Sequence, residues 1–145
     1  MRCWPATALA LALLPLAGCA DDTERYCDAV KEHQKELSEI TAEGGPTALL
    51  DALDIYRDLQ DQSPSDISDE WQQVVRSIES LAAALDEAGV DPASYDPGDP
   101  PTDLSEEDRE AIARAADEVG SLETQEALRG VEQQARDVCK TPLSQ

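Results

Sequence analysis

Apolar side chains between residues 71 and 88 recur at intervals of three and four residues, and this pattern constrains the fold more than any other feature. In an α-helix of 3.6 residues per turn, residues spaced in this way lie on one face. The pattern therefore predicts an amphipathic helix of almost five turns, whose apolar face other helices must cover. Its members are Trp71, Val74, Val75, Ile78, Leu81, Leu85 and Ala88.

Composition alone would predict a disordered chain. Leu, Ile and Val account for 23 of the 127 residues from 19 to 145, about 18%, and the whole chain carries a formal net charge of −21. Few aliphatic side chains together with a large net charge are typical of disorder. The helical periodicity argues against it, and 16 alanines in the same segment favour helices that pack closely. We therefore expect a folded domain.

Further apolar stripes predict helices over residues 22–42, 46–61 and 122–140, and one that starts after Ser105 and runs to Gly120. No strand pattern appears. The predicted fold is all-α, an up-down bundle of four helices, or of five segments if Gly120 is a full break. The side chains expected to point inward from the flanking helices include Tyr26, Cys27, Val30, Leu37, Leu49, Leu50, Leu53, Tyr56, Leu59, Leu122, Ala127, Leu128, Val131, Ala135 and Val138.

Local signals mark the ends of these helices. The central helix, beginning near Ser65 or Ser68, should end at Gly89, with Val90 making the apolar contact of a Schellman cap. Residues 90–104 hold five prolines or glycines and form the longest irregular stretch, after which Ser105 caps the next helix.

The first 19 residues read as a targeting signal. An uncharged, mostly apolar run is too short to span a bilayer but suits a signal peptide. It ends in Leu16-Ala17-Gly18-Cys19, which resembles a bacterial lipobox. That resemblance implies removal of residues 1–18 and a diacylglyceryl group on the sulfur of Cys19, which would hold the protein on the extracytoplasmic face of the cell membrane. The alternative, an ordinary secretory signal cut nearby, also exports the protein.

Residues 19–24 would then be a lipidated tether, 25–140 the bundle and 141–145 a tail. With Cys19 lipidated, Cys27 and Cys139 remain as an even pair in an oxidising compartment, where a disulfide is the default. An up-down bundle places the start of its first helix beside the end of its last, which agrees with this pairing. The rival interpretation, a redox or metal pair, lacks any matching spacing.

Taken together, the motifs resemble those of small helical lipoproteins from actinobacteria. They are the lipobox, Tyr26-Cys27 shortly after it, the segment 67–71 that opens a central helix with Trp71, and the segment 123–127 leading to Cys139. The resemblance implies a helical, lipid-anchored protein stapled by a disulfide. It implies no activity, cofactor or site residue, since the family has no assigned function.

Several kinds of chemistry are disfavoured. So acidic a chain repels nucleic-acid phosphates. His33 is the only histidine, flanked by Glu32 and Gln34 without a nucleophile elbow, so a catalytic triad is not expected. Glu106 and Glu110 could imitate a glycosidase pair, but an exposed acidic face explains them more simply. We predict no enzymatic activity and no cofactor.

Two functions remain open. We expect an acidic binding module that engages an envelope protein or a basic ligand. The alternative is a carrier of a small ligand or of calcium, for which the weak candidates are Asp91, Asp96, Asp99 and Asp103. Tyr95, in the same loop, is either a contact point for a partner or a side chain folded back over the core.

Overall fold

The computed structural model describes residues 18–45 and 47–145, with side chains from residue 21 onward. This part of the chain contains six α-helices and no strand, so the predicted all-α bundle is confirmed. The helices are α1 (Gly18–Glu43), α2 (Ala48–Asp51), α3 (Leu53–Gln62), α4 (Ser68–Glu87), α5 (Glu106–Val119) and α6 (Leu122–Asp137).

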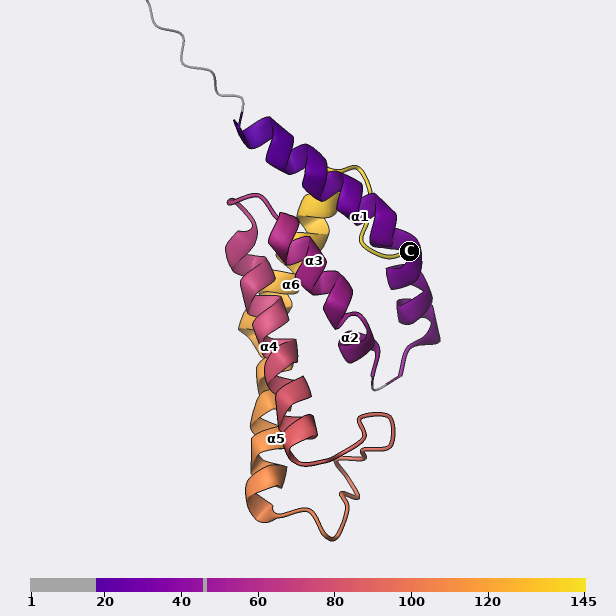
Figure 1. Cartoon of the computed structure of the whole chain (residues 1–145), viewed down its shortest axis with the longest axis vertical. Helices are drawn as coiled ribbons and strands as arrows, with labels where there is room; N and C mark the ends of the chain where they lie inside the picture. The colour runs from indigo at the N-terminus through magenta and orange to yellow at the C-terminus, as the bar shows by residue number, and fades with distance from the viewer. Residues whose placement is uncertain (1–17, 46) are drawn as a thin grey trace, which may run out of the picture.

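The chain makes four passes along the long axis of the molecule (Figure 1). Helix α1 runs away from the N-terminal end, α2 and α3 return, α4 runs down toward the opposite end, and α5 and α6 return one after the other. Helix α4 packs against α3, α5 and α6, whereas α1 packs against α3. The bundle is therefore deepest in the half that holds α1, α3 and α6, and thinner where α4 meets only α5 and a loop.

The break at Gly120 is complete, which gives α5 and α6 as separate helices. Gly120 keeps helical angles, and the break lies at Ser121, which is extended at φ −64° and ψ 154°. The Ser121 hydroxyl accepts a hydrogen bond from the Thr124 backbone N–H at 3.2 Å and so starts α6.

The Schellman cap predicted at the end of α4 is also confirmed. Gly89 has φ +65°, the left-handed conformation that glycine adopts without strain. The Val90 N–H donates to the Leu85 carbonyl at 2.9 Å and the Gly89 N–H donates to the Asp86 carbonyl at 3.0 Å. The Val90 side chain packs on the small core that contains Leu85.

Two helix boundaries differ from those predicted. The helix expected over 46–61 is divided at Ala52 into α2 and α3, and no proline or glycine marks this break. Helix α1 begins at Gly18 rather than at residue 22, because no residue from 19 to 24 interrupts a helix and acidic residues suit its first turn. The role of residues 19–24 as a lipidated tether stays a prediction.

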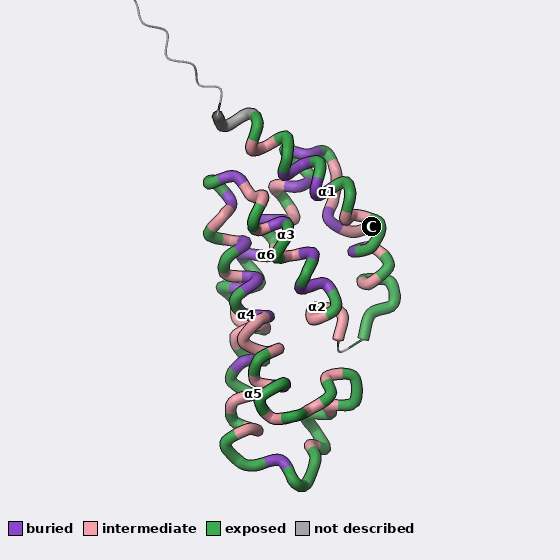
Figure 2. Tube along the Cα trace, in the orientation of Figure 1, coloured by how far each residue is buried: buried purple, intermediate pink, exposed green. Residues whose placement is uncertain are grey.

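The main core is centred on Trp71, which is fully buried. Buried positions gather mainly in the upper half of the molecule (Figure 2). The indole Nε1–H of Trp71 donates to the hydroxyl of Tyr26 at 3.0 Å, and the two rings meet edge to face with centroids 6.5 Å apart. Tyr56 also packs on Trp71, with the two ring centroids 5.7 Å apart. One indole from α4 thus joins α1 and α3 to the centre of the bundle.

Cys27 and Cys139 form the predicted disulfide, with Cα atoms 5.0 Å apart. The bond joins α1 to the segment that follows α6, directly beside Tyr26. The C-terminal tail then packs back along α1, where the Gln34 side chain donates to the Pro142 carbonyl at 2.9 Å. Leu143 is buried in the main core, so residues 141–145 belong to the packed structure.

Three residues predicted to be buried are exposed. Leu122 is 75% exposed, Val138 46% and Leu49 37%. Leu122 is the first residue of α6 and Val138 is its C-cap, so a helical pattern extended to the helix ends overstates their burial. Leu49 lies in the short α2, which is not continuous with α3.

A second, smaller core lies at the other end of α4. It consists of Leu85, Leu104 and Ile112, with Val90 and Tyr95 among the partly buried side chains around it. Its buried residues are not part of the main core, although Leu50 packs against both, and it contains no disulfide, so this end rests on a few apolar contacts.

The Trp71–Tyr26 hydrogen bond yields a stability prediction. Replacing Trp71 with Phe should destabilise the fold by about 2–4 kcal/mol, because volume is lost and the buried Tyr26 hydroxyl loses its donor. Trp71→Phe and Tyr26→Phe should couple by about 1 kcal/mol in a double-mutant cycle measured by urea unfolding. The control is Tyr56→Phe. A coupling near zero would contradict the role given to this bond.

Burial of Tyr26 also yields a pH prediction. Burial raises the pKa of Tyr26 from 10.0 to about 12, the carboxylate of Asp66 adds to the rise, and the hydrogen bond from Trp71 opposes it. The folded protein therefore holds this proton more tightly than the unfolded chain. The contribution of this proton to the free energy of unfolding should be fully present below pH 10. It should be lost as the pH rises through 12, which lowers the free energy of unfolding by about 2–3 kcal/mol. Urea unfolding from pH 8 to pH 12 should show a shallower fall in Tyr26→Phe; an unchanged slope would contradict the assignment.

Candidate functional site

The loop between α4 and α5 is irregular but held by short turns. The carboxylate of Asp91 accepts from the Ala93 N–H at 3.0 Å, and that of Asp96 accepts from the Gly98 N–H at 2.8 Å. The loop closes where the Leu104 N–H donates to the Pro101 carbonyl at 3.2 Å. Aspartate side chains commonly close turns in this way. The sequence therefore sets the path of the loop locally.

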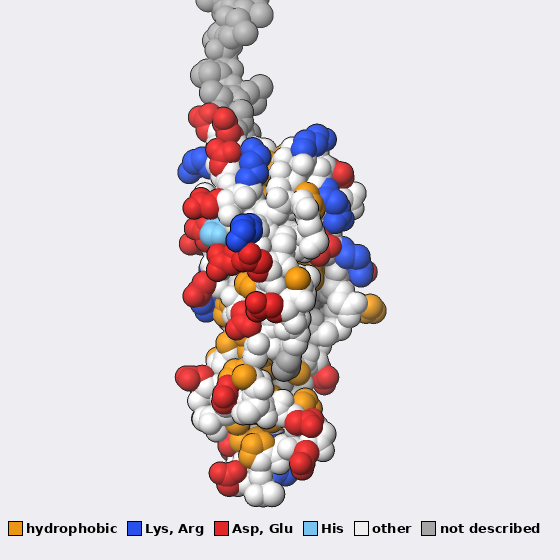
Figure 3. Space-filling view, turned by 90° about the vertical axis from the view of Figure 1, so that its right-hand side faces the viewer, with side chains coloured by type: hydrophobic (Ala, Val, Ile, Leu, Met, Phe, Trp, Pro, Cys, Tyr) orange, Lys and Arg blue, Asp and Glu red, His pale blue; other side chains and the backbone are white. Residues whose placement is uncertain are grey.

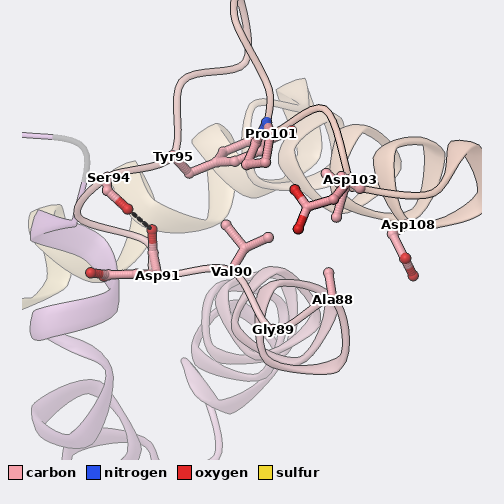
Figure 4. Close-up of a pocket in the computed structure, with 10 residues that line it drawn as sticks. Ala88, Gly89, Val90, Asp91, Ser94, Tyr95, Pro101, Asp103 and Asp108 are labelled. Atoms are coloured by element: carbon pink, nitrogen blue, oxygen red, sulfur yellow. Dashed lines mark hydrogen bonds between the residues drawn. The ribbon is translucent and has the colours of Figure 1, made fainter.

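This loop and the end of α4 enclose a cavity of about 360 Å³ (Figure 4). The Schellman turn forms its floor, and the segment from Tyr95 to Leu104 forms the opposite wall. Val90 points into the space between the two, and Tyr95 and Pro101 lie across from it. The lining residues are Ala88, Gly89, Val90, Asp91, Ser94, Tyr95, Pro101, Asp103, Leu104 and Asp108.

Three carboxylates line the cavity, but they differ in what holds them. Asp91 is occupied by the Ala93 N–H at 3.0 Å, and Asp108 accepts from the Ser105 hydroxyl at 2.6 Å in the cap of α5. Asp103 has no hydrogen bond or ion pair within the described part of the chain. Its carboxylate points toward the space between Val90 and Pro101 (Figure 4). Asp103 is therefore the one carboxylate of the three that has no partner within the described residues.

Of the two alternatives considered for Tyr95, the structure shows the side chain folded back over the core; a contact with a partner stays a prediction. The Tyr95 ring packs against the small core of Leu85, Leu104 and Ile112, so the side chain folds back over the protein. It also lines the cavity, and it is half-buried rather than fully enclosed. One part of the ring thus stays available to a ligand.

The four calcium candidates are not gathered at one point. Asp91 and Asp103 line the cavity, whereas Asp96 and Asp99 do not. Among the described residues, no group of three or more His, Cys, Asp or Glu side chains is placed to hold a metal ion. A bare divalent cation normally needs six or more oxygen ligands.

His33 forms a pair with a carboxylate on a neighbouring helix. Its Nε2 lies 2.8 Å from Oδ2 of Asp58 in α3, and the Gln62 side chain donates to the same oxygen at 2.8 Å. No hydroxyl or thiol is hydrogen-bonded to His33 in the described residues. The geometry is that of a bridge between α1 and α3.

The two carboxylates that could imitate a glycosidase pair are each engaged by an arginine. Oε2 of Glu106 lies 3.3 Å from Nη1 of Arg109, and Oε2 of Glu110 lies 3.7 Å from Nη1 of Arg114. Both pairs lie on the outside of α5. Neither glutamate lines the loop cavity. The structure thus places them on an exposed helix face.

Charge is distributed unevenly along the molecule. Residues 86–118, which contain the loop and most of α5, hold twelve Asp or Glu but only two basic residues, Arg109 and Arg114. In Figure 3 the blue side chains gather mainly in the upper half, whereas red ones extend over the whole face. The cavity therefore lies in the most negative part of the chain.

The predictions for the first 18 residues and for the side chain of Cys19 concern parts of the chain outside the described residues. This applies to the signal peptide and to lipidation. None of the described helices is both long and apolar enough to cross a membrane.

Sequence reasoning found the parts of this site but not the site itself. The Schellman pattern identified Val90, and Tyr95 stood out as the aromatic residue of the loop. What it missed is that Asp103 and Pro101 face Val90, because no periodic pattern fixes the path of a loop. Comparison of the chain with family models, with curated proteins and with solved structures finds no match.

The small core beneath the loop yields a prediction about local stability. Leu104→Ala should cost about 2–4 kcal/mol by leaving a gap between α4 and α5. Hydrogen exchange should accelerate in residues 88–112 while α6 keeps its protection, because the disulfide-linked core is separate. The matched control, Leu122→Ala, removes a side chain that is 75% exposed and should change little. Equal acceleration in both halves would show a single cooperative unit.

Proposed function

We propose that this protein is a lipoprotein, anchored through Cys19 on the extracytoplasmic face of the cell membrane. Its acidic loop end, the end of the molecule that holds the loop between α4 and α5, binds a basic partner in the cell envelope. The observation that carries the proposal is the separation of the two ends. Helix α1 starts at one end of the long axis, and the loop between α4 and α5 lies at the other (Figure 1). An anchor at Cys19 would leave the loop end facing away from the lipid.

The charge at the loop end supports binding rather than internal stabilisation. Glu107 and Asp117 are exposed and have no ion pair within the described residues, as is also true of Asp99 in the loop. Uncompensated charges of one sign attract an oppositely charged partner and speed its approach. Such an interaction weakens as salt is added, since the Debye length falls to about 10 Å at 0.1 M.

The partner can be sought by in-cell crosslinking of the tagged full chain, followed by mass spectrometry. We expect a stoichiometric envelope protein that is lost in the triple variant Asp99→Asn, Glu107→Gln and Asp117→Asn. The reason is that these three carboxylates are exposed and make no ion pair within the described residues; Asp99 and Glu107 lie at the end that holds the loop, and Asp117 lies in the last turn of α5. The same crosslink should survive neutralisation of three acids on α1.

The matched α1 control is Glu24→Gln, Glu36→Gln and Glu43→Gln, which removes the same charge from exposed positions of the other half. A partner retained in the loop-end variant, or lost equally in both, would contradict recognition by the loop end. The anchor is tested separately: Cys19→Ala should move the protein from the membrane fraction to the soluble fraction. A membrane fraction unchanged by that substitution would overturn the lipoprotein assignment.

A further inference from the structure

We propose that the cavity beneath the loop binds an organic cation, an ammonium or guanidinium group carried on a short apolar stem. The inference deepens the proposed function and rests on it in one respect: the cation is either a basic side chain of the partner or a free small amine. Both present the same chemistry to the cavity, and the two sources are separated by experiment below.

The size and walls of the cavity fit such a group. A volume of about 360 Å³ is at the lower end of the range for small-molecule sites. Val90 and Pro101 provide apolar surface, and the exposed part of the Tyr95 ring adds an aromatic wall. A methylene stem can pack on these side chains while its charged end reaches the carboxylates.

Electrostatics select a cation at this position. Asp91, Asp103 and Asp108 line the cavity, and no lysine or arginine does. The nearest arginine in sequence, Arg109, donates at 2.8 Å to the carbonyl of Leu104, which itself lines the cavity, and its guanidinium also lies 3.3 Å from Glu106. Three lining carboxylates beside this one arginine leave the cavity with a net negative charge.

The arrangement favours an organic cation over a metal ion. Asp103 alone is free of internal partners, while Asp91 and Asp108 are already hydrogen-bonded within the loop and the helix cap. One free carboxylate cannot replace the hydration shell of a divalent ion. It can, however, accept a charge-assisted hydrogen bond from an ammonium or guanidinium group. The face of Tyr95 can attract the same group through its ring quadrupole.

The test uses the purified full chain in detergent and two probes, butylamine and the peptide acetyl-Ala-Lys-Ala-amide. Amide NMR shifts of residues 88–104 should move saturably with either probe. Butanol, which has the same stem without the charge, should leave them unchanged. No saturable shift with either amine, or an equal shift with butanol, would overturn the proposal.

Variants identify the residues responsible. Asp103→Asn should weaken binding about tenfold because it removes the free carboxylate charge, and Tyr95→Leu about two- to fivefold because it keeps the apolar wall but loses the ring. Asp96→Asn, a loop carboxylate that does not line the cavity, is the matched control and should bind as the parent does. Binding unchanged in Asp103→Asn would overturn the assignment.

The comparison of probes and variants keeps the two proposals distinct. Tighter binding of the lysine peptide identifies a partner side chain as the source, and tighter binding of butylamine identifies a free amine. If no amine binds the cavity but the crosslinked partner is still lost in the loop-end triple variant, this inference fails and the proposed function stands. If amines bind the cavity but no partner is captured, the cation site stands and the proposed partner binding fails.

Discussion

The contact between Trp71 and Tyr26 organises the rest of the structure. The indole of α4 donates to a phenol of α1 in a fully buried setting, and both polar groups are satisfied by one hydrogen bond. With so few aliphatic side chains, the chain relies on these aromatic rings to fill its centre. Cys27 follows Tyr26 directly, so the disulfide ties the C-terminal end of the bundle to the same point.

The helical passes of this fold are predictable because each of their signals is local. The spacing from Trp71 to Leu85 defines the buried face of α4, and Gly89 with Val90 defines its end, since only a residue tolerant of positive φ fits there. Ser105 and Ser121 start α5 and α6 by accepting backbone hydrogen bonds. These features depend on neighbours within one or two turns, which a single sequence contains.

The candidate site is less predictable because it depends on long-range placement. Asp103 and Val90 meet across a proline-rich loop, and no repeat in the sequence fixes that distance. The same limit explains Leu122: it continues the apolar stripe of α6, but whether a partner helix extends far enough to cover it is decided elsewhere in the chain. Burial at helix ends and the shape of loops are properties of the assembled bundle.

The position of the disulfide has a consequence for resistance to proteases. Cys27 and Cys139 close a covalent ring that includes every helix after the start of α1 and the whole loop from 88 to 105. Exposed, irregular loops are where proteolytic cuts concentrate. A single cut in this loop would leave the two fragments joined through the ring, with the tyrosine–tryptophan centre intact, so the protein can be nicked at its most accessible point without falling apart.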